Sequence, residues 1–237
     1  MTNPAEMLLT IVDEWPGDEP VSLARGVSFR DSASAWRTHR VAVGHLSAIE
    51  QLIDALAANG SFVGHYRSGL ERWTQHVFAE PSAWGERPNH EFEILHAADR
   101  DLLMALSQQI NQEGLVNELT EAQRSNVGMA LDDAINALAA NDLPPELQRH
   151  MYEVITHVRR CLEEYGLFGA FELSTAIQRL MAVVQAATAF TEQNSESSPS
   201  ASMWSRVRTA LYDPFTVAVV GGLSSSVLPL MIGGAAG

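Results

Sequence analysis

Apolar residues recur at helical spacing through residues 1–191, and alternation of the kind that marks a β-strand is scarce there. Between residues 62 and 77, the large apolar side chains follow one another every three or four positions, which places them on one face of a helix. We therefore predict an all-α fold: a helical bundle built from antiparallel helical hairpins, followed by a flexible linker and a C-terminal hydrophobic helix.

Residues that begin and end helices divide the bundle into successive elements. Asparagine and threonine cap helix N-termini with their side-chain oxygens, proline is tolerated in the first turn, and glycine commonly ends a helix. The expected starts are Asn3-Pro4, Asp31 or Ser32, Thr120 and Pro144-Pro145, and the expected ends are Pro16-Gly17, Asn59-Gly60, Gly114 and Gly166. Residues 80–89 are expected to form a loop.

Two segments resemble each other within the chain. Residues 49–60 (IEQLIDALAANG) and residues 131–142 (LDDAINALAAND) align without gaps, and each ends one expected helix just before another begins. Short connections of this kind join antiparallel neighbours. Two related helical hairpins are one interpretation, and chance similarity between alanine-rich helices is the other.

The composition changes after the helical body. We expect an acidic cytosolic bundle over residues 1–191, a Ser-rich linker over 192–202, and a tail over 203–237 that combines an amphipathic helix with a transmembrane segment. The net charge is −14, yet the tail contains two arginines and one aspartate, so the negative charge belongs to the preceding residues. Such an acidic body repels phosphate backbones, and we expect no nucleic-acid partner.

No charged side chain occurs in residues 214–237. As a helix, residues 215–237 would measure roughly 34 Å at about 1.5 Å per residue, enough for a bilayer core of about 30 Å. Arg206 and Arg208 would lie on the cytoplasmic flank, and Trp204 and Tyr212 would lie at the interface. The other expected tail residues are Phe215, Val217, Val219, Val220, Leu223, Val227, Leu228, Leu230 and Ile232.

A transmembrane tail predicts that the chain is located at the cytoplasmic membrane with its body facing the cytoplasm. Gly221-Gly222 and Pro229 lower helix propensity, although membrane spans tolerate them better than soluble helices do. Small residues also let helices approach closely, so the tail could self-associate. The alternatives are a cytoplasmic protein whose tail docks on its own body, and a disordered tail.

No motif in the sequence predicts catalysis, a cofactor or a metal site. Only one Glu-x-x-His pair occurs, Glu93 with His96, whereas di-metal bundles require two. Neither His65 with His76 nor His150 with His157 has a spacing that forms one chelate. Cys161 is the only cysteine, which favours a reducing compartment. Within a helix it is expected to pack as a small apolar residue, although neighbouring arginines could lower its pKa.

Arg159 and Arg160 are the candidate residues for contact with a protein partner. A guanidinium pair could bind an acidic surface or a phosphate group. The structural alternative is an ion pair between one of these arginines and Glu163 or Glu164 on the same helix.

Residues 143–181 resemble a helical module of uncharacterised bacterial proteins. In that module a Pro-Glu-Leu helix start leads to an Arg-Arg pair, a Glu-Tyr-Gly stop and a glycine-containing helix. The matching positions are Pro145, Glu146, Leu147, Arg159, Arg160, Glu164, Tyr165, Gly166 and Gly169. The resemblance implies a bacterial origin and a helical body, and it implies no reaction.

The first functional hypothesis is a non-enzymatic, membrane-tethered helical protein that acts through protein contacts, as a homo-oligomer or with a partner. A defence or toxin-type effector that self-associates through its tail is one version. The second hypothesis is a soluble helical adaptor whose apolar tail docks on its own body or on a partner. An enzyme with a site in the bundle is the third.

Overall fold

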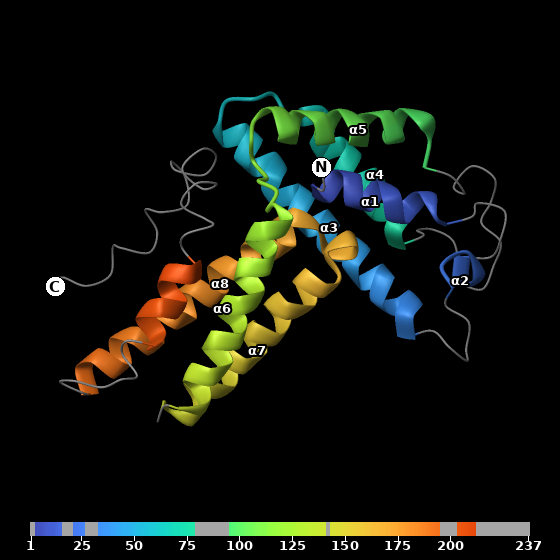
Figure 1. The fold of residues 1–237 in the computed structure, drawn as a ribbon. Coiled ribbons are helices and arrows are strands. Elements are labelled where there is room, and N and C mark those ends of the chain that lie inside the picture. The colour runs from blue at the N-terminus through green and yellow to red at the C-terminus, as the bar shows by residue number, and fades with distance from the viewer. Residues whose placement is uncertain are drawn as a thin grey trace. The chain divides into compact units, whose positions relative to one another are not determined.

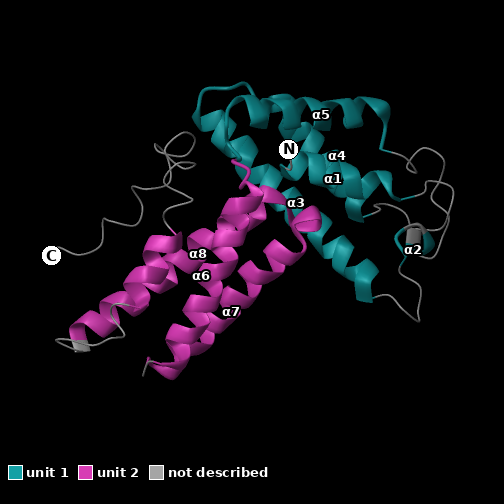
Figure 2. Ribbon diagram, in the orientation of Figure 1, with its two compact units in different colours: residues 1–116 teal, residues 117–237 magenta. Residues whose placement is uncertain are grey.

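The computed structural model describes residues 3–15, 21–26, 33–78, 95–140, 143–194 and 203–211. Within these ranges every regular element is a helix, which confirms the predicted all-α class (Figure 1). The chain divides into two compact units, residues 1–116 and residues 117–237 (Figure 2). No feature of the sequence predicted a division at this point.

Unit 1 contains α1 (Pro4–Asp13), α2 (Val21–Ala24), α3 (Ala33–Ala58), α4 (Gly64–Phe78) and α5 (Ala97–Gln112). Both α1 and α4 pack against α3 and also against α5, so these four helices enclose one core. Its largest fully buried side chains are Trp73, Leu8, Ile49, Ile53, Leu56, Leu103, Leu106 and Ile110.

Polar side chains tie the first helix of unit 1 to the last. Asn3 caps α1, as predicted, because its side-chain oxygen accepts hydrogen bonds from the backbone N–H groups of Ala5 and Glu6. Its amide nitrogen donates to Ser107 Oγ at 2.9 Å and to Asn111 Oδ1 at 3.0 Å, both on α5. A single buried side chain therefore starts α1 and also holds it against α5.

Unit 2 contains α6 (Glu121–Ala139), α7 (Pro145–Glu163) and α8 (Tyr165–Asn194), with a further helical segment at residues 203–211. In this unit α7 packs against both α6 and α8. The helix start predicted at Thr120 is confirmed, and the structure shows a capping box there, since Thr120 and Gln123 each bond to the other's backbone N–H. The core draws residues from all four helical segments, among them Val127, Leu131, Met151, Ile155, Leu173, Ile177, Leu180, Val184, Trp204, Val207 and Leu211.

Several predicted boundaries are confirmed, and others are wrong. Gly60 and Gly114 end α3 and α5 with φ values of 87° and 62°, the left-handed conformation that favours glycine. Phe62, expected on the apolar face of α4, precedes that helix and is 81% exposed. Trp36, whose position in the sequence fits the helical spacing of the apolar residues of α3, is also exposed. The expected loop at 80–89 lies outside the described residues.

The turn between α7 and α8 depends on a glycine other than the one predicted. Gly166 was expected to stop α7, which ends at Glu163. The non-helical residue is Gly169, with φ 74° and ψ −179°, and it interrupts α8 after a first short turn. Essentially only glycine occupies this region of the backbone map, since a Cβ atom would clash with the chain itself. Gly169 therefore sets the direction in which the rest of α8 leaves α7.

Replacing Gly169 with alanine is expected to lower the free energy of unfolding of unit 2 by about 1–3 kcal/mol, because the substitution strains the backbone. Gly166→Ala is the matched control, since a Cβ added there meets nothing within 4 Å and Gly166 has no left-handed φ. The control should be neutral or more stable by up to about 1 kcal/mol from helix propensity. Chemical denaturation of both variants measures the difference, and equal stabilities would refute the assigned turn.

Candidate functional site

The two arginines predicted to contact a partner have different environments. Arg159 donates to Asp132 Oδ1 of α6 at 2.5 Å. Arg159 therefore joins α7 to α6, a contact between helices that differs from the predicted pairing with Glu163 or Glu164 on the same helix. Both partners are solvent-exposed, so the pair contributes little to stability. Arg160 is exposed on another side of α7.

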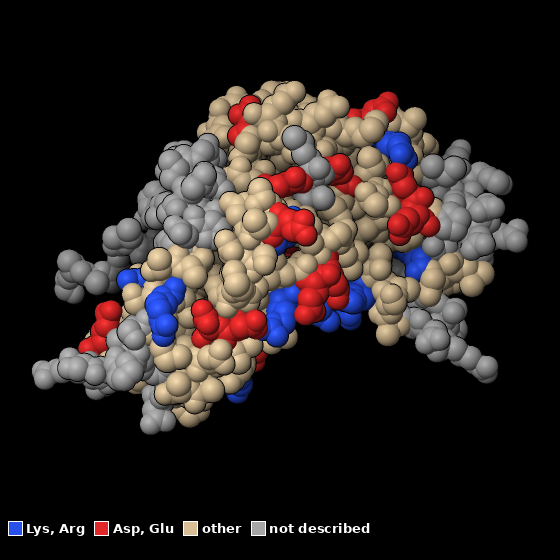
Figure 3. Space-filling view, in the orientation of Figure 1, with Lys and Arg blue, Asp and Glu red and all other residues tan. Residues whose placement is uncertain are grey.

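An open groove of about 680 Å³ lies along α7. Its residues recur every three or four positions and so share one helix face: Arg149, Tyr152, Glu153, Thr156, His157 and Arg160. Figure 3 shows one face of the protein, on which arginines and acidic residues are interspersed. The groove combines two guanidinium groups, one carboxylate and hydroxyl groups around an imidazole.

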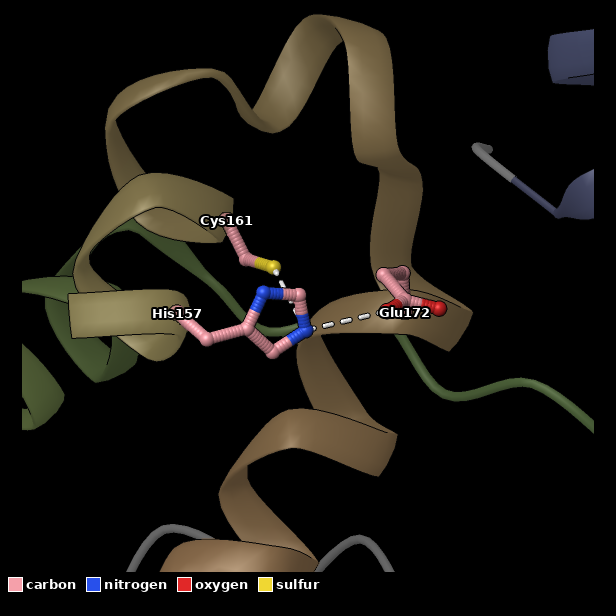
Figure 4. Close-up of side chains that lie close together, drawn as sticks. All are labelled: His157, Cys161 and Glu172. Carbon is pink, nitrogen blue, oxygen red and sulfur yellow. Dashed lines mark hydrogen bonds and ion pairs between the residues drawn. The ribbon is translucent and has the colours of Figure 1, made fainter. Parts of the chain in front are cut away.

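Next to this groove, which His157 lines, three side chains of different chemistry meet. His157 and Cys161 come from α7, and Glu172 comes from α8 (Figure 4). His157 Nε2 lies 3.1 Å from Glu172 Oε1 and 3.9 Å from Cys161 Sγ, and all three donor atoms lie within 4.8 Å of one another. His157 and Glu172 are each about one-third exposed, whereas Cys161 is buried.

The local sequence explains why these three side chains lie close together. His157 and Cys161 are four residues apart on α7, so their side chains lie one above the other on the same face. Glu172 follows the interruption at Gly169 by three residues, at the start of the long part of α8 that returns along α7. The site thus depends on the helix period in α7 and on the turn before α8.

The thiol of Cys161 is protonated at neutral pH. Burial, reinforced by the negative charge of Glu172, raises the pKa of Cys161 to about 12, and nearby Arg160 opposes this shift only in part. The suggestion that adjacent arginines activate Cys161 is therefore wrong: the thiol is not poised to act as a free nucleophile. Both contacts of His157 use the same ring nitrogen, so the arrangement also lacks the relay of a hydrolytic triad, in which the two ring nitrogens serve different partners.

No metal ligand was predicted from the sequence, and this cluster was not identified there. The available signal was the His-x-x-x-Cys spacing at residues 157–161, which places two ligand atoms on one helix face. Glu172 carried no comparable signal, because its approach depends on the path of the chain after Gly169. Glu93 of the one Glu-x-x-His pair lies outside the described residues.

Trp204, expected at a membrane interface, lies elsewhere. It is fully buried in the core of unit 2 together with Val207 and Leu211, so the apolar face of residues 203–211 packs against protein. Arg206 and Arg208 of the same segment are exposed. The remaining tail residues, from Tyr212 to Ile232, lie outside the described part of the chain.

Two described helices have the length and composition to cross a membrane, α3 and residues Tyr165–Gln193 of α8. Each also contributes to the core of its own unit, with 50% and 39% of the apolar window buried. Core helices of soluble proteins have the same properties, so these helices give only weak support for membrane association.

A second group of ionisable side chains lies in unit 1, around the end of α4. Arg25 donates to the backbone oxygens of Val77 and His76, and its guanidinium lies 4.5 Å from the centre of the Trp15 ring. It therefore satisfies carbonyl groups that the helix leaves without partners, and its positive charge favours the negative end of the helix dipole. Burial lowers the pKa of Arg25 to about 10, so it remains charged at neutral pH.

Comparison with known proteins assigns no family to this chain. No protein-family model, curated protein or solved structure matches it.

The stability of unit 1 is expected to fall in mild acid because of His76. Burial lowers the pKa of His76 from 6.5 to about 4, helped by Arg25 and His96 and opposed by Asp99. Between these two values the unfolded chain binds a proton that the folded chain does not, so stability is complete above about pH 6.5 and decreases as the pH falls towards 4. Denaturation across this range measures the effect.

The variant His76→Gln should weaken this pH dependence, and His150→Gln, which changes an exposed histidine, should leave it intact. The imidazole signal of His76 in an NMR titration should have its midpoint near pH 4. A midpoint near 6.5 would contradict the described burial.

Proposed function

We propose that this protein is a membrane-tethered helical protein that acts through protein contacts rather than catalysis. The observation that carries the proposal is the uncharged run of residues 214–237, which is long enough to cross a bilayer as a helix. Water solvates such a run poorly, and hydrocarbon or a protein groove is the environment that favours it. The proposed location is the cytoplasmic membrane, with the helical units in the cytoplasm.

The position of residues 203–211 supports a short tether. Leu211 is buried in the core of unit 2, and only Tyr212 and Asp213 separate it from the uncharged run. The exposed Arg206 and Arg208 precede the run, where the positive-inside preference favours a cytoplasmic flank. On this proposal unit 2 would be held close to the membrane surface instead of at the end of a long linker.

Two parts of the chain support the proposal that the protein acts through contacts with other proteins. The groove of α7 presents Arg149, Tyr152 and Arg160 to solvent, and arginine and tyrosine are common at protein interfaces. The tail contains Gly221-Gly222 and Gly233-Gly234, whose small size permits close packing of helices in lipid. A defence or toxin-type effector that assembles through its tail remains one version of this proposal.

Membrane fractionation tests the tether. The intact chain, expressed in bacteria, should stay in the pellet after high-salt and carbonate washes, and it should float with lipid in a density gradient. The double variant Val220→Arg with Leu223→Arg should leave the membrane fraction, because each arginine at the centre of a span costs about 2.5–3.5 kcal/mol. The matched control, Val220→Leu with Leu223→Val, keeps the apolar composition and should float like the intact chain.

The structure also determines where the chain should be shortened. Ending it at Ser202 would remove Trp204, Val207 and Leu211 from the core, and each such side chain contributes about 1.5–3 kcal/mol by burial. A chain that ends at Asp213 keeps this core and should be found in the supernatant. If the intact chain is already in the supernatant without detergent, the soluble adaptor is the better account.

A further inference from the structure

We propose that His157, Cys161 and Glu172 bind a divalent transition-metal ion of the zinc class and thereby join α7 to α8. Two of the three ligands come from one helix and the third from the other, so an ion bound by all three would connect the two elements. The proposal is independent of the membrane tether, because none of these residues belongs to the tail.

The distances fit this assignment. Tetrahedral zinc binds nitrogen and oxygen at about 2.0–2.2 Å and sulfur at about 2.3 Å, which places neighbouring ligand atoms roughly 3.3–3.6 Å apart. His157 Nε2 lies 3.1 Å from Glu172 Oε1 and 3.9 Å from Cys161 Sγ, and no pair of donor atoms is more than 4.8 Å apart. Small side-chain rotations would therefore bring all three atoms to bonding distance from one point.

Charge balance favours an ion with two positive charges. A thiolate at Cys161 and a carboxylate at Glu172 together carry two negative charges, which are unfavourable side by side in a partly buried site. A divalent cation would compensate both negative charges and leave the three-ligand site electrically neutral.

The ligand types select the class of metal. Thiolate and imidazole suit zinc and related transition metals, whereas magnesium and calcium prefer sites made of oxygen. Three protein ligands leave one tetrahedral position for water or another small ligand, as in catalytic rather than closed structural zinc sites. Because His157 also lines the groove of α7, the ion would lie beside a surface that carries Arg149 and Arg160.

The competing interpretation needs no metal. Nε2 of His157 can donate a hydrogen bond to Glu172 at 3.1 Å, and Cys161 can pack beside them as a buried thiol. Such a cluster would hold the helices together without binding an ion. Metal titration separates the two interpretations, because only the first predicts stoichiometric binding through sulfur.

The test uses the full chain, freed of metal with a chelator and titrated with Zn²⁺ against a chromophoric competitor, and separately with Co²⁺. One ion per chain should bind, and the cobalt form should show the near-ultraviolet charge-transfer band of thiolate ligation. Cys161→Ser should lose this band, and Glu172→Gln should weaken zinc binding at least tenfold, since loss of even an outer-shell partner of a metal ligand typically costs about 10–100-fold in affinity. Zinc should raise the melting temperature of the parent protein and have less effect on Glu172→Gln.

The control is His150→Gln. His150 lies on the same helix and has its own acidic neighbour, Glu153, at 4.0 Å, but it is exposed and lies apart from the sulfur. It should leave zinc affinity and the cobalt band unchanged. Glu172 is partly exposed, so Glu172→Gln keeps the test valid if Cys161→Ser fails to fold. Absence of stoichiometric binding, binding without the sulfur band, or equal affinity in the parent and Glu172→Gln would each overturn the proposal.

Discussion

The backbone conformation of Gly169 determines how α8 packs on α7, and both the core and the candidate site of unit 2 depend on this packing. Its φ of 74° with ψ of −179° breaks the helix after one turn and redirects the chain, so that the long part of α8 packs along α7. This pairing buries Cys161 and brings Glu172 within 3.1 Å of His157. A residue with a Cβ atom would strain this turn, and the register between the two helices would then have to change.

The same pairing accounts for the helical segment at 203–211. Trp204, Val207 and Leu211 are buried in a core that α6, α7 and α8 build together. The amphipathic pattern of this segment is thus explained by protein contacts, with its two arginines left exposed. On our proposal the consequence is mechanical: a membrane span that begins after Asp213 would be attached directly to a folded unit.

The features of the fold that were predicted correctly are local ones. The caps at Asn3 and Thr120 and the glycines at 60 and 114 act within a few residues, so the sequence is sufficient to find them. The errors concern features that depend on the tertiary structure. Gly166 and Gly169 are equally plausible stops in the sequence, and only packing determines which one turns the chain. Phe62 matches the period of α4, but the helix begins two residues later.

The candidate site could be predicted from the sequence only in part, because its residues come together through the tertiary structure. The spacing of His157 and Cys161 was visible in the sequence, but the two residues were not considered together, and Cys161 was interpreted as a packed apolar residue. Glu172 lies beyond a turn whose direction the sequence does not specify. Arg159 pairs with Asp132, an interaction between residues that are far apart in the sequence, so only the local alternative could be proposed beforehand.

The candidate site and the core of unit 2 both depend on the register of α8 on α7, and a double-mutant cycle between His157 and Glu172 measures whether the two helices meet in this register. The unfolding free energies of the parent chain, His157→Gln, Glu172→Gln and the double variant would be measured with a chelator present, so that no metal contributes. Side chains in contact are expected to show a coupling energy of about 0.5 kcal/mol or more. Strictly additive effects would mean that the two side chains do not meet, and the described register would be wrong.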